Sequence, residues 1–161
     1  MSAEAALKAL EAQEAALVFD SFDEQVAMKL GMAALALAES RGQSVWINVS
    51  RGLHTLFEFS MPGTAPMNAD FGRRKRSVVN LMHFSSARFY IEKLNGFNWV
   101  EFMGLDPREF GTHAGCVPIR VANAGVVGSM TISGLSDIDD HNMVVEIMNA
   151  HLGTSAAPLS L

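Results

Sequence analysis

The chain has 161 residues, a formal net charge of −5 and 49% hydrophobic residues. This length and composition suit one globular domain over residues 1–161, and the negative charge argues against nucleic acid or anionic lipid as a partner. The single cysteine, Cys116, excludes an intrachain disulfide and fits a reducing compartment. The N-terminus does not resemble a secretory signal, and the longest apolar run, near residues 31–38, is too short to cross a bilayer. We therefore expect a cytoplasmic protein.

The first two predicted elements are helices. Residues 3–17 are rich in Ala, Glu and Leu, which favour the helical conformation. Ser21 and Glu24 have the spacing of a capping box, so a second helix is expected to begin with Ser21 as its cap. Gly42 is placed to end this helix, because glycine readily adopts the conformation that terminates a helix.

The second predicted helix is apolar on two sides. Its apolar positions are Val26, Leu30, Ala34 and Leu37 on one stripe and Met28, Met32 and Leu35 on another. A helix that is apolar on more than one face is buried on both. We therefore expect both faces to be covered, either inside the domain or against another subunit.

A β-hairpin and further helices follow. Alternating apolar residues over 45–49 and 55–59 predict two antiparallel strands joined by a tight turn. Asp70 is placed to cap a long helix over residues 73–94, and a short helix is expected over residues 99–103.

The last predicted elements are a second hairpin and a final helix. Alternation over residues 117–121 and 126–132 predicts the two strands. Pro118 cannot donate a backbone hydrogen bond, so it belongs to an edge strand or to the start of a strand. Ser136 is expected to cap the final helix and Gly153 to end it.

This order of elements predicts an α/β domain of the α+β type. Because the strands come as two hairpins separated by helices, the sheet should be antiparallel with helices packed on it. A profilin-like and a PAS-like layout both fit this order. Residues 8–153 are expected to form the ordered core, and residues 154–161 a flexible tail.

Four consecutive cations, Arg73, Arg74, Lys75 and Arg76, lie near the expected start of the long helix. Positive charge there opposes the helix dipole, which suggests another reason for the cluster. One hypothesis is an anion site, in which arginine side chains and free backbone N–H groups hold carboxylates or phosphates. The alternative is a solvated helix face, or ion pairs with acidic residues of a neighbouring subunit.

His113, Gly115 and Cys116 form a second group of candidates. A glycine at a strand commonly marks the close approach of a ligand or of another backbone. His113 and Cys116 have a His-x-x-Cys spacing, but a zinc site would need two more ligands, which no CxxC or HxxxH motif supplies. Cys116 could be a nucleophile activated by His113, although no third residue that orients them is identifiable, or it could be a thiol that fills space. His113 could instead ligate a haem iron or bind a carboxylate.

Other polar residues have two interpretations each. His54 on its strand fits simple exposure, and His83 beside a phenylalanine fits a core histidine; either could also be a ligand. Asp139, Asp140 and His141 at the start of the last helix suit capping or the polar wall of a pocket. The chain has no phosphate-binding glycine loop, dinucleotide fingerprint, GxSxG or HExxH motif, which argues against common hydrolases and nucleotide enzymes.

Several short pieces, taken in their order and spacing, resemble the haem-degrading-domain family that includes HbpS, GlcG and the C-terminal domain of PduO. These pieces are Gly115–Ile119, Gly125–Gly128, Ile132–Gly134 and Asp140. Over roughly residues 8–153, the chain is more similar still to the uncharacterised UPF-type branch of that family. The residues behind this similarity are Glu11–Glu14, Ser21–Asp23, Arg73–Lys75, Ser85–Ser86 and Gly104–Pro107.

The resemblance implies a profilin-like, three-layer domain with a central antiparallel sheet of about five strands and helices on both faces. It also implies homo-oligomers, and haem binding or haem degradation in some members. One residue departs from the family pattern: Ala114 stands where the family often has the first glycine of a pair. If this position required a positive φ, alanine would reduce stability or change the loop.

Three functions follow as hypotheses. The first is a homo-oligomeric protein that binds a small anionic ligand or cofactor such as haem. Its expected ligand contacts are Arg73, Arg74, Lys75, His113, Gly115 and Cys116. The alternative is an oligomeric interaction protein without small-molecule chemistry, which the doubly apolar helix and the ten Met and ten Phe favour. The third is oxidative haem degradation, for which the sequence identifies no base, nucleophile or oxidant site.

Overall fold

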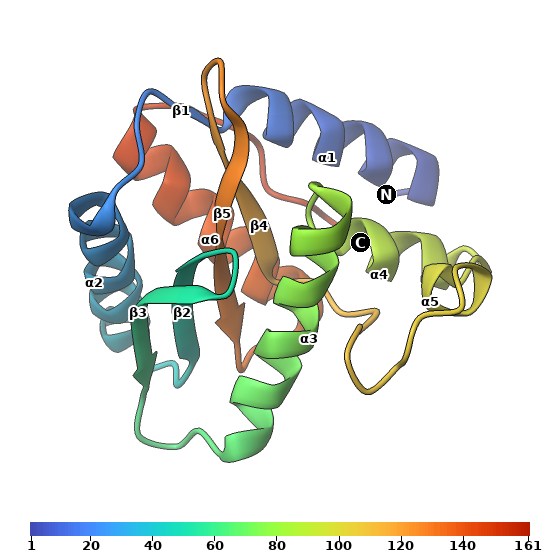
Figure 1. The fold of residues 1–161 in the computed structure, drawn as a ribbon, viewed down its shortest axis with the longest axis horizontal. Coiled ribbons are helices and arrows are strands. Elements are labelled where there is room, and N and C mark those ends of the chain that lie inside the picture. The colour runs from blue at the N-terminus through green and yellow to red at the C-terminus, as the bar shows by residue number, and fades with distance from the viewer.

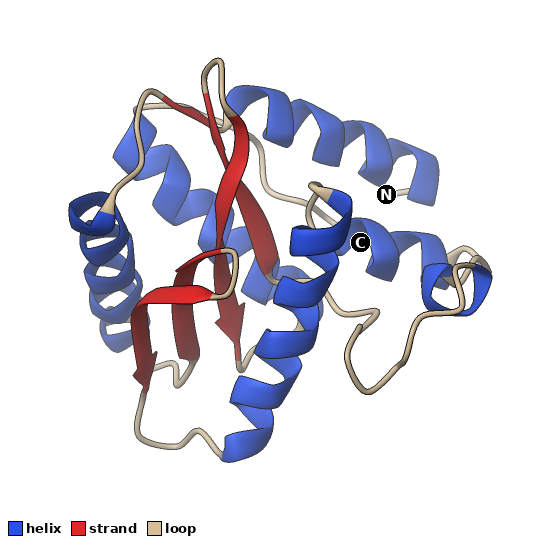
Figure 2. Cartoon of the chain, viewed as in Figure 1, coloured by secondary structure: helices blue, strands red, loops and turns tan.

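The computed structural model describes residues 1–161, which form six helices and five strands (Figure 1, Figure 2). The helices are α1 (Ala3–Ala16), α2 (Glu24–Ser40), α3 (Pro66–Met82), α4 (Ala87–Leu94), α5 (Trp99–Phe102) and α6 (Asp137–Leu152). The strands are β1 (Val18–Phe19), β2 (Trp46–Arg51), β3 (His54–Ser60), β4 (Cys116–Val121) and β5 (Gly125–Ser133). None of the helices combines the length and the hydrophobicity that crossing a membrane requires.

The five strands form one sheet in the order β1-β4-β5-β2-β3. The two hairpins and their antiparallel pairing are confirmed. Only β1, which pairs parallel with β4, was not predicted, because a strand of two residues leaves no alternation in the sequence. β1 reaches β4 only at Arg120 and Val121, so Pro118 lies where β4 has a neighbour on one side only, as its missing donor requires.

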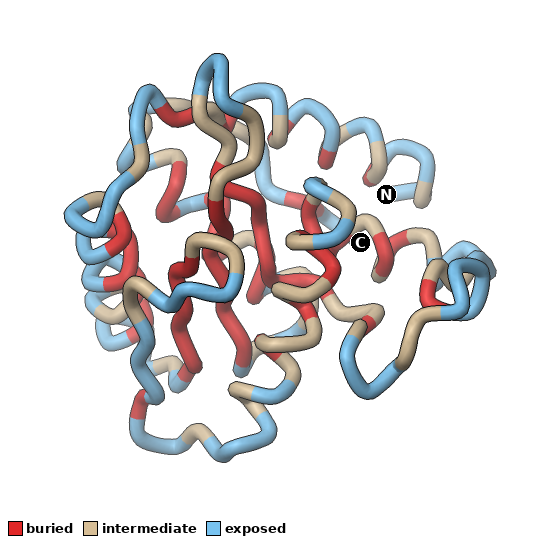
Figure 3. Tube along the Cα trace, viewed as in Figure 1, coloured by how far each residue is buried: buried red, intermediate tan, exposed pale blue.

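Helices cover both faces of the sheet, which confirms the three-layer arrangement (Figure 1). α2 and α6 pack on one face and enclose the main apolar core, whose buried side chains include Leu30, Ile47 and Ile132. α3 crosses the other face, and α1 and α4 pack together beside it around Leu10 and Ile91. Buried positions therefore concentrate along the central strands (Figure 3).

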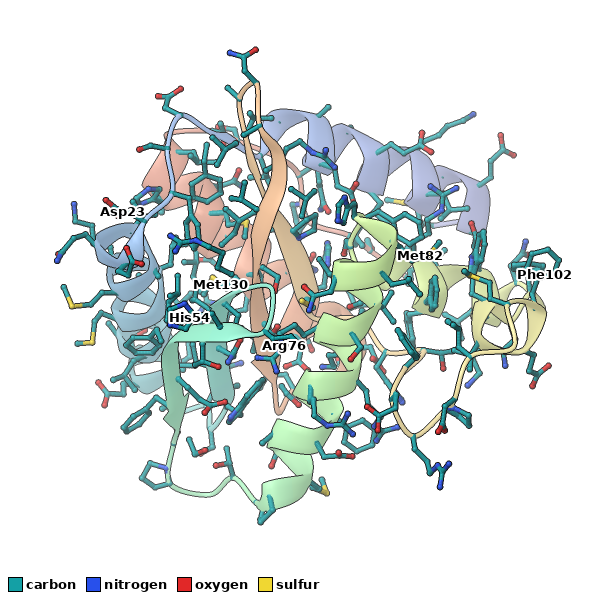
Figure 4. The ribbon with its side chains drawn as sticks, viewed as in Figure 1. Asp23, His54, Arg76, Met82, Phe102 and Met130 are labelled. Atoms are coloured by element: carbon teal, nitrogen blue, oxygen red, sulfur yellow. The ribbon has the colours of Figure 1, made fainter.

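The face of the sheet under α3 is polar although it is buried. Its fully buried polar side chains are Asn48, Ser50, Ser129 and Thr131. Arg76 of α3 donates hydrogen bonds to Asn48 Oδ1 at 3.3 Å and to Ser50 Oγ at 3.1 Å, and its side chain lies between the helix and the strands in Figure 4. Gly72 allows α3 to approach this closely, because a Cβ at that position would overlap the ring of Trp46.

α2 begins two residues later than the capping box predicts. Asp23, not Ser21, is the cap, and its Oδ1 accepts a hydrogen bond from the Val26 N–H at 2.9 Å. Either residue type suits this position, so the sequence alone could not choose between them. The first apolar stripe of α2 lies in the core, whereas Met28 and Met32 of the second stripe remain exposed.

The predicted single helix over residues 73–94 is wrong, because the structure has two helices there, α3 and α4. The predicted start at residue 73 also lies seven residues after the observed start at Pro66. Pro66 occupies the first turn of α3, where its fixed φ suits a helix start, and the preceding Ala65 N–H is bonded by Asn68 Oδ1 at 2.8 Å. His83 ends α3 in the left-handed conformation with φ of 59°. His83 is exposed, not a core histidine, and His54 is exposed as expected.

The last helix agrees with the sequence at both ends. Ser136 Oγ accepts a hydrogen bond from the Asp139 N–H at 3.2 Å, and Gly153 ends α6 with φ of 69°. Residues beyond Gly153 form no helix or strand, but they lie against the domain instead of forming the expected flexible tail. Leu159 is buried and exchanges two hydrogen bonds with the side chain of Asn142, at 2.8 and 2.9 Å.

Candidate functional site

The four cations of α3 point in four directions, because successive helix residues are rotated by about 100°. Arg73 lies at the surface, where it forms ion pairs with Asp70 at 3.0 Å and Glu109 at 2.7 Å. Arg76 faces the sheet, as described above. Arg73 and Arg74 share the Asp70 carboxylate, whereas Lys75 pairs with Asp140 elsewhere, so the three cations do not surround one point.

Lys75 is buried and forms an ion pair with Asp140 at the start of α6. Its Nζ lies 2.7 Å from Asp140 Oδ2 and also donates to the Ile132 carbonyl at 3.2 Å. Burial raises the pKa of Asp140, although Lys75 and the N–H groups of Leu135 and Gly134 act in the opposite direction. This pair joins α3, β5 and α6 under the pocket described below.

Gly115 is required by the space around the same ion pair. Its φ is +123°, and a Cβ there would lie 2.6 Å from the Ile132 carbonyl oxygen and 2.8 Å from Lys75 Nζ. Ala114, in contrast, is buried and is not among the residues with positive φ, so alanine is compatible with the backbone at this position. Its N–H donates to Asp137 Oδ1 at 2.8 Å. Only the second position of the family's glycine pair therefore needs to be glycine here.

His113 is half-buried between two pockets. Its Nδ1 lies 3.3 Å from Asp137 Oδ1, and its ring packs edge-on against Phe71 at 4.9 Å between centroids. Burial alone would raise the pKa of Asp137, but the hydrogen bonds from His113 and from the Ala114 N–H lower it below its ordinary value. Asp137 therefore remains ionised and orients the imidazole.

Cys116 is fully buried between the sheet and α3, away from both pockets. Its Sγ accepts a hydrogen bond from Thr131 Oγ1 at 3.0 Å, and burial raises its pKa to about 11. The thiol is therefore protonated at neutral pH, whereas a nucleophile or metal ligand would be the thiolate. His113 and Cys116 do not form a pair, and Cys116 serves as packing.

The two pockets beside His113 differ in charge. The first has a volume of about 210 Å³. Its lining contains both basic and acidic side chains, because Lys75 pairs with Asp140 and His113 pairs with Asp137. The second, about 220 Å³, has no carboxylate in its lining. Its polar lining residues are Arg74, Lys93, Asn98, Thr112 and His113. We call this second pocket the cationic pocket.

Arg74 and Lys93 supply the positive charge of the cationic pocket. The Arg74 guanidinium lies over the ring of Phe71, 4.5 Å from its centroid. Its Nε is buried and forms an ion pair with Asp70 Oδ2 at 3.2 Å. Lys93 Nζ donates to Thr112 Oγ1 at 2.9 Å. The pocket thus has two cations in its lining, of which Arg74 is also paired with Asp70.

Sequence reasoning found Arg74 and His113 of this pocket but missed Lys93, Asn98 and Thr112. In one continuous helix, residues 74 and 93 would be about 28 Å apart at 1.5 Å per residue. The break at His83 turns α4 away from α3 and brings Lys93 beside Arg74. No local signal in the sequence announces this contact.

His141 belongs to a buried network and reaches neither pocket. Its Nε2 lies 2.8 Å from Gln13 Oε1 and its Nδ1 3.3 Å from Ser85 Oγ. Burial lowers its pKa to about 3, so the ring is neutral. Of its two neighbours, Asp139 accepts a hydrogen bond from the capping Ser136, whereas Asp140 lines the first pocket. Asp139 therefore belongs to the helix cap, and Asp140 belongs to the polar wall of a pocket.

Comparisons with known proteins show which family this chain resembles. A model of the family described as haem degrading protein HbpS-like matches residues 22–149. A UPF0303 protein of Azotobacter vinelandii is 38% identical over 156 residues, which cover 96% of this chain and 94% of the relative.

Solved structures share the fold. The crystal structure of the Ybr137w protein superposes with a TM-score of 0.84 at 26% identity, covering 91% of this chain and 87% of that chain. The crystal structure of a PduOC–haem complex has a TM-score of 0.66 at 16% identity, covering 84% and 96%. The family match and the near-full-length relative confirm the resemblance seen in the sequence. The chain therefore belongs to the HbpS-like family of haem degrading proteins, and its relatives include the UPF0303 proteins.

Proposed function

We propose that this protein binds a small anionic ligand in the cationic pocket. One observation supports the proposal: Arg74, Lys93 and His113 line a pocket that has no carboxylate among its lining residues. A carboxylate or phosphate bound there would form charge-assisted hydrogen bonds with these side chains, which are stronger than neutral hydrogen bonds.

The size of the pocket limits which part of a ligand it encloses. Its volume of about 220 Å³ is below the roughly 300–1,000 Å³ of pockets that bury a drug-sized ligand. For haem, these residues fit a propionate group but not the macrocycle, which would lie outside. Asp137 orients His113 through Nδ1 and leaves Nε2 free, the arrangement of a histidine that is available to a metal. The wall of a neighbouring subunit would be needed to cover the ring.

Binding of inorganic phosphate, citrate and haem to wild type and to two matched variants tests the proposal. Arg74→Gln removes the cation in the pocket, whereas Arg73→Gln removes an adjacent cation that points to the surface. We expect Arg74→Gln to weaken binding by about tenfold or more, as loss of a charge-assisted contact does, and Arg73→Gln by less than about twofold. Calorimetry measures the affinity for the two anions, and a saturable Soret shift measures haem binding.

The outcomes separate the ligand classes. Binding of phosphate or citrate without a haem shift would support an anion site that does not take haem. Equal loss of affinity in the two variants, or no binding of any probe to wild type, would contradict the proposal.

A second proposal is that the protein forms homo-oligomers in the cytoplasm. Exposed apolar side chains on two adjoining elements support it: Met32 is 52% exposed on α2, and Phe59 is 42% exposed on β3. Patches of this kind mark protein interaction sites in soluble proteins. A cytoplasmic location suits the free thiol of Cys116.

A further inference from the structure

β3 is an unpaired edge of the sheet. The opposite edge is the two-residue β1, which is too short to recruit another strand, but β3 has seven residues and no strand beyond it. Edge strands present unpaired backbone N–H and C=O groups, and natural proteins usually shield them with lysine, proline or a covering segment. Between His54 and Ser60 there is neither lysine nor proline.

The register of β3 identifies which of its backbone groups are free. The Met61 N–H donates to the Val45 carbonyl at 3.2 Å. In an antiparallel ladder, residues that exchange hydrogen bonds alternate with residues that do not. Phe59, opposite Ile47, therefore bonds to β2, whereas Glu58 and Ser60 direct their N–H and C=O groups away from the sheet.

α2 places an apolar stripe above this same edge. Gly31 packs directly against the ring of Phe57 in β3. At about 100° per residue, Met28 and Met32 lie farther around the helix from Gly31, on the side away from the core residue Ala34. They are 49% and 52% exposed, and Phe59 on the edge strand is 42% exposed. Of the stripe that the sequence predicted to be buried, Leu35 packs against the core, whereas Met28 and Met32 are left exposed.

We propose that two copies of this chain pair antiparallel through β3, around a two-fold axis at Phe59. This inference rests on the proposed homo-oligomer and specifies its interface. Glu58 of each copy lies opposite Ser60 of the other, so their outward backbone groups exchange hydrogen bonds and no two glutamates face each other. The sheet continues across the dimer, and the methionine stripes of the two α2 helices cover one another.

A second copy is the occupant that fits this edge because the surface complements itself. An isologous interface requires one patch that matches its own image, and a strand pairing about a central residue meets that condition. A two-fold axis perpendicular to the sheet also keeps both α2 helices on the same face, so the apolar stripes meet each other instead of water.

Cysteine cross-linking of the full-length protein tests the pairing directly. Phe59→Cys places two thiols at the axis, at a non-hydrogen-bonded pair where Cβ atoms are about 4.5–5.5 Å apart. The native Cys116 is fully buried, so it does not interfere. We expect mild oxidation to convert most of the Phe59→Cys protein to a covalent dimer. Phe102→Cys, on the opposite side of the molecule from His54 and β3 (Figure 4), is the matched control and should not cross-link.

Mass measurements by light scattering complete the test. Met32→Lys buries a charge in the interface, and Ser60→Pro removes one outward N–H group, with Ser60→Ala as its control. Met32→Lys and Ser60→Pro are each expected to reduce the particle mass at least twofold relative to wild type without changing the circular dichroism spectrum. Ser60→Ala and Phe102→Lys are expected to preserve the wild-type mass.

Two results would overturn the interface, and they are distinguishable. A wild-type protein that is strictly monomeric at micromolar concentration overturns the homo-oligomer and the interface together. A wild-type oligomer that survives Met32→Lys and Ser60→Pro, but dissociates in Phe102→Lys, overturns only the β3 interface and moves it to the α5 surface.

Discussion

Gly115 occupies a position in which backbone conformation and space both exclude a side chain. Its φ of +123° strains any other residue, and the Ile132 carbonyl and Lys75 Nζ occupy the volume of a Cβ. Gly125 also has a positive φ, of +79°, which is nearer the left-handed region, and nothing lies within 4 Å of its added Cβ. A side chain at Gly125 therefore has a conformational cost without the steric cost that it has at Gly115.

Gly115→Ala is therefore expected to lower the free energy of unfolding by about 2–4 kcal/mol, and Gly125→Ala by about 1 kcal/mol. The larger loss combines left-handed strain with overpacking against a buried ion pair. Urea denaturation of the two variants measures both values. Equal losses would mean that the surroundings of Gly115 relax around the methyl group.

At the scale of elements, α6 forms one buried ion pair and one exposed ion pair with the rest of the fold. Lys75 of α3 and Asp140 are buried almost completely. Arg41, which follows α2, and Glu146 are joined at 2.8 Å, but their side chains are 41% and 51% exposed. A charge left unpaired by mutation is solvated in the second case and not in the first.

Asp140→Asn is expected to lower the free energy of unfolding by about 3–5 kcal/mol, because it leaves Lys75 charged and buried. Glu146→Gln should cost less than about 1 kcal/mol. The double variant Lys75→Met with Asp140→Leu is expected to cost less than the sum of its single variants, since it removes both charges. A double-mutant cycle in urea gives these numbers, and strict additivity would contradict a direct coupling between the two side chains.

At the scale of the whole molecule, stability in mild acid depends on His141. This residue joins α6 to α1 through Gln13 and to the turn before α4 through Ser85. Burial lowers its pKa from 6.5 to about 3, so the unfolded chain takes up a proton at a higher pH than the folded chain does. The contribution of neutral His141 is complete above pH 6.5 and is lost as the pH falls from 6.5 towards 3.

We therefore expect the free energy of unfolding to fall, through this residue, by up to about 1.4 kcal/mol per pH unit below pH 6. Glu14 and Asp140, whose pKa values are raised by burial, act in the opposite direction, so the comparison with His141→Gln isolates the histidine. Urea denaturation between pH 4.5 and pH 7 is the measurement. A wild-type slope equal to that of His141→Gln would show that His141 does not control this acid sensitivity.

The sequence by itself determined the features that depend on neighbouring residues. Ser136 and Gly153 bound α6 because a cap and a left-handed stop act within one helical turn. Both hairpins followed from alternation, and short motifs in a fixed order identified the family. The exposed methionine stripe of α2 was visible as a pattern, although not its place above β3.

Only the tertiary structure reveals the candidate site. His83 breaks the predicted long helix with a conformation that a non-glycine residue rarely adopts, and this break brings Lys93 beside Arg74. Helical rotation separates Lys75 from Arg73 and Arg74, although adjacency in the sequence suggests that the three would act together. Contacts between residues far apart in the chain depend on how helices are oriented, and orientation is set by packing across the sheet and not by any local run of residues.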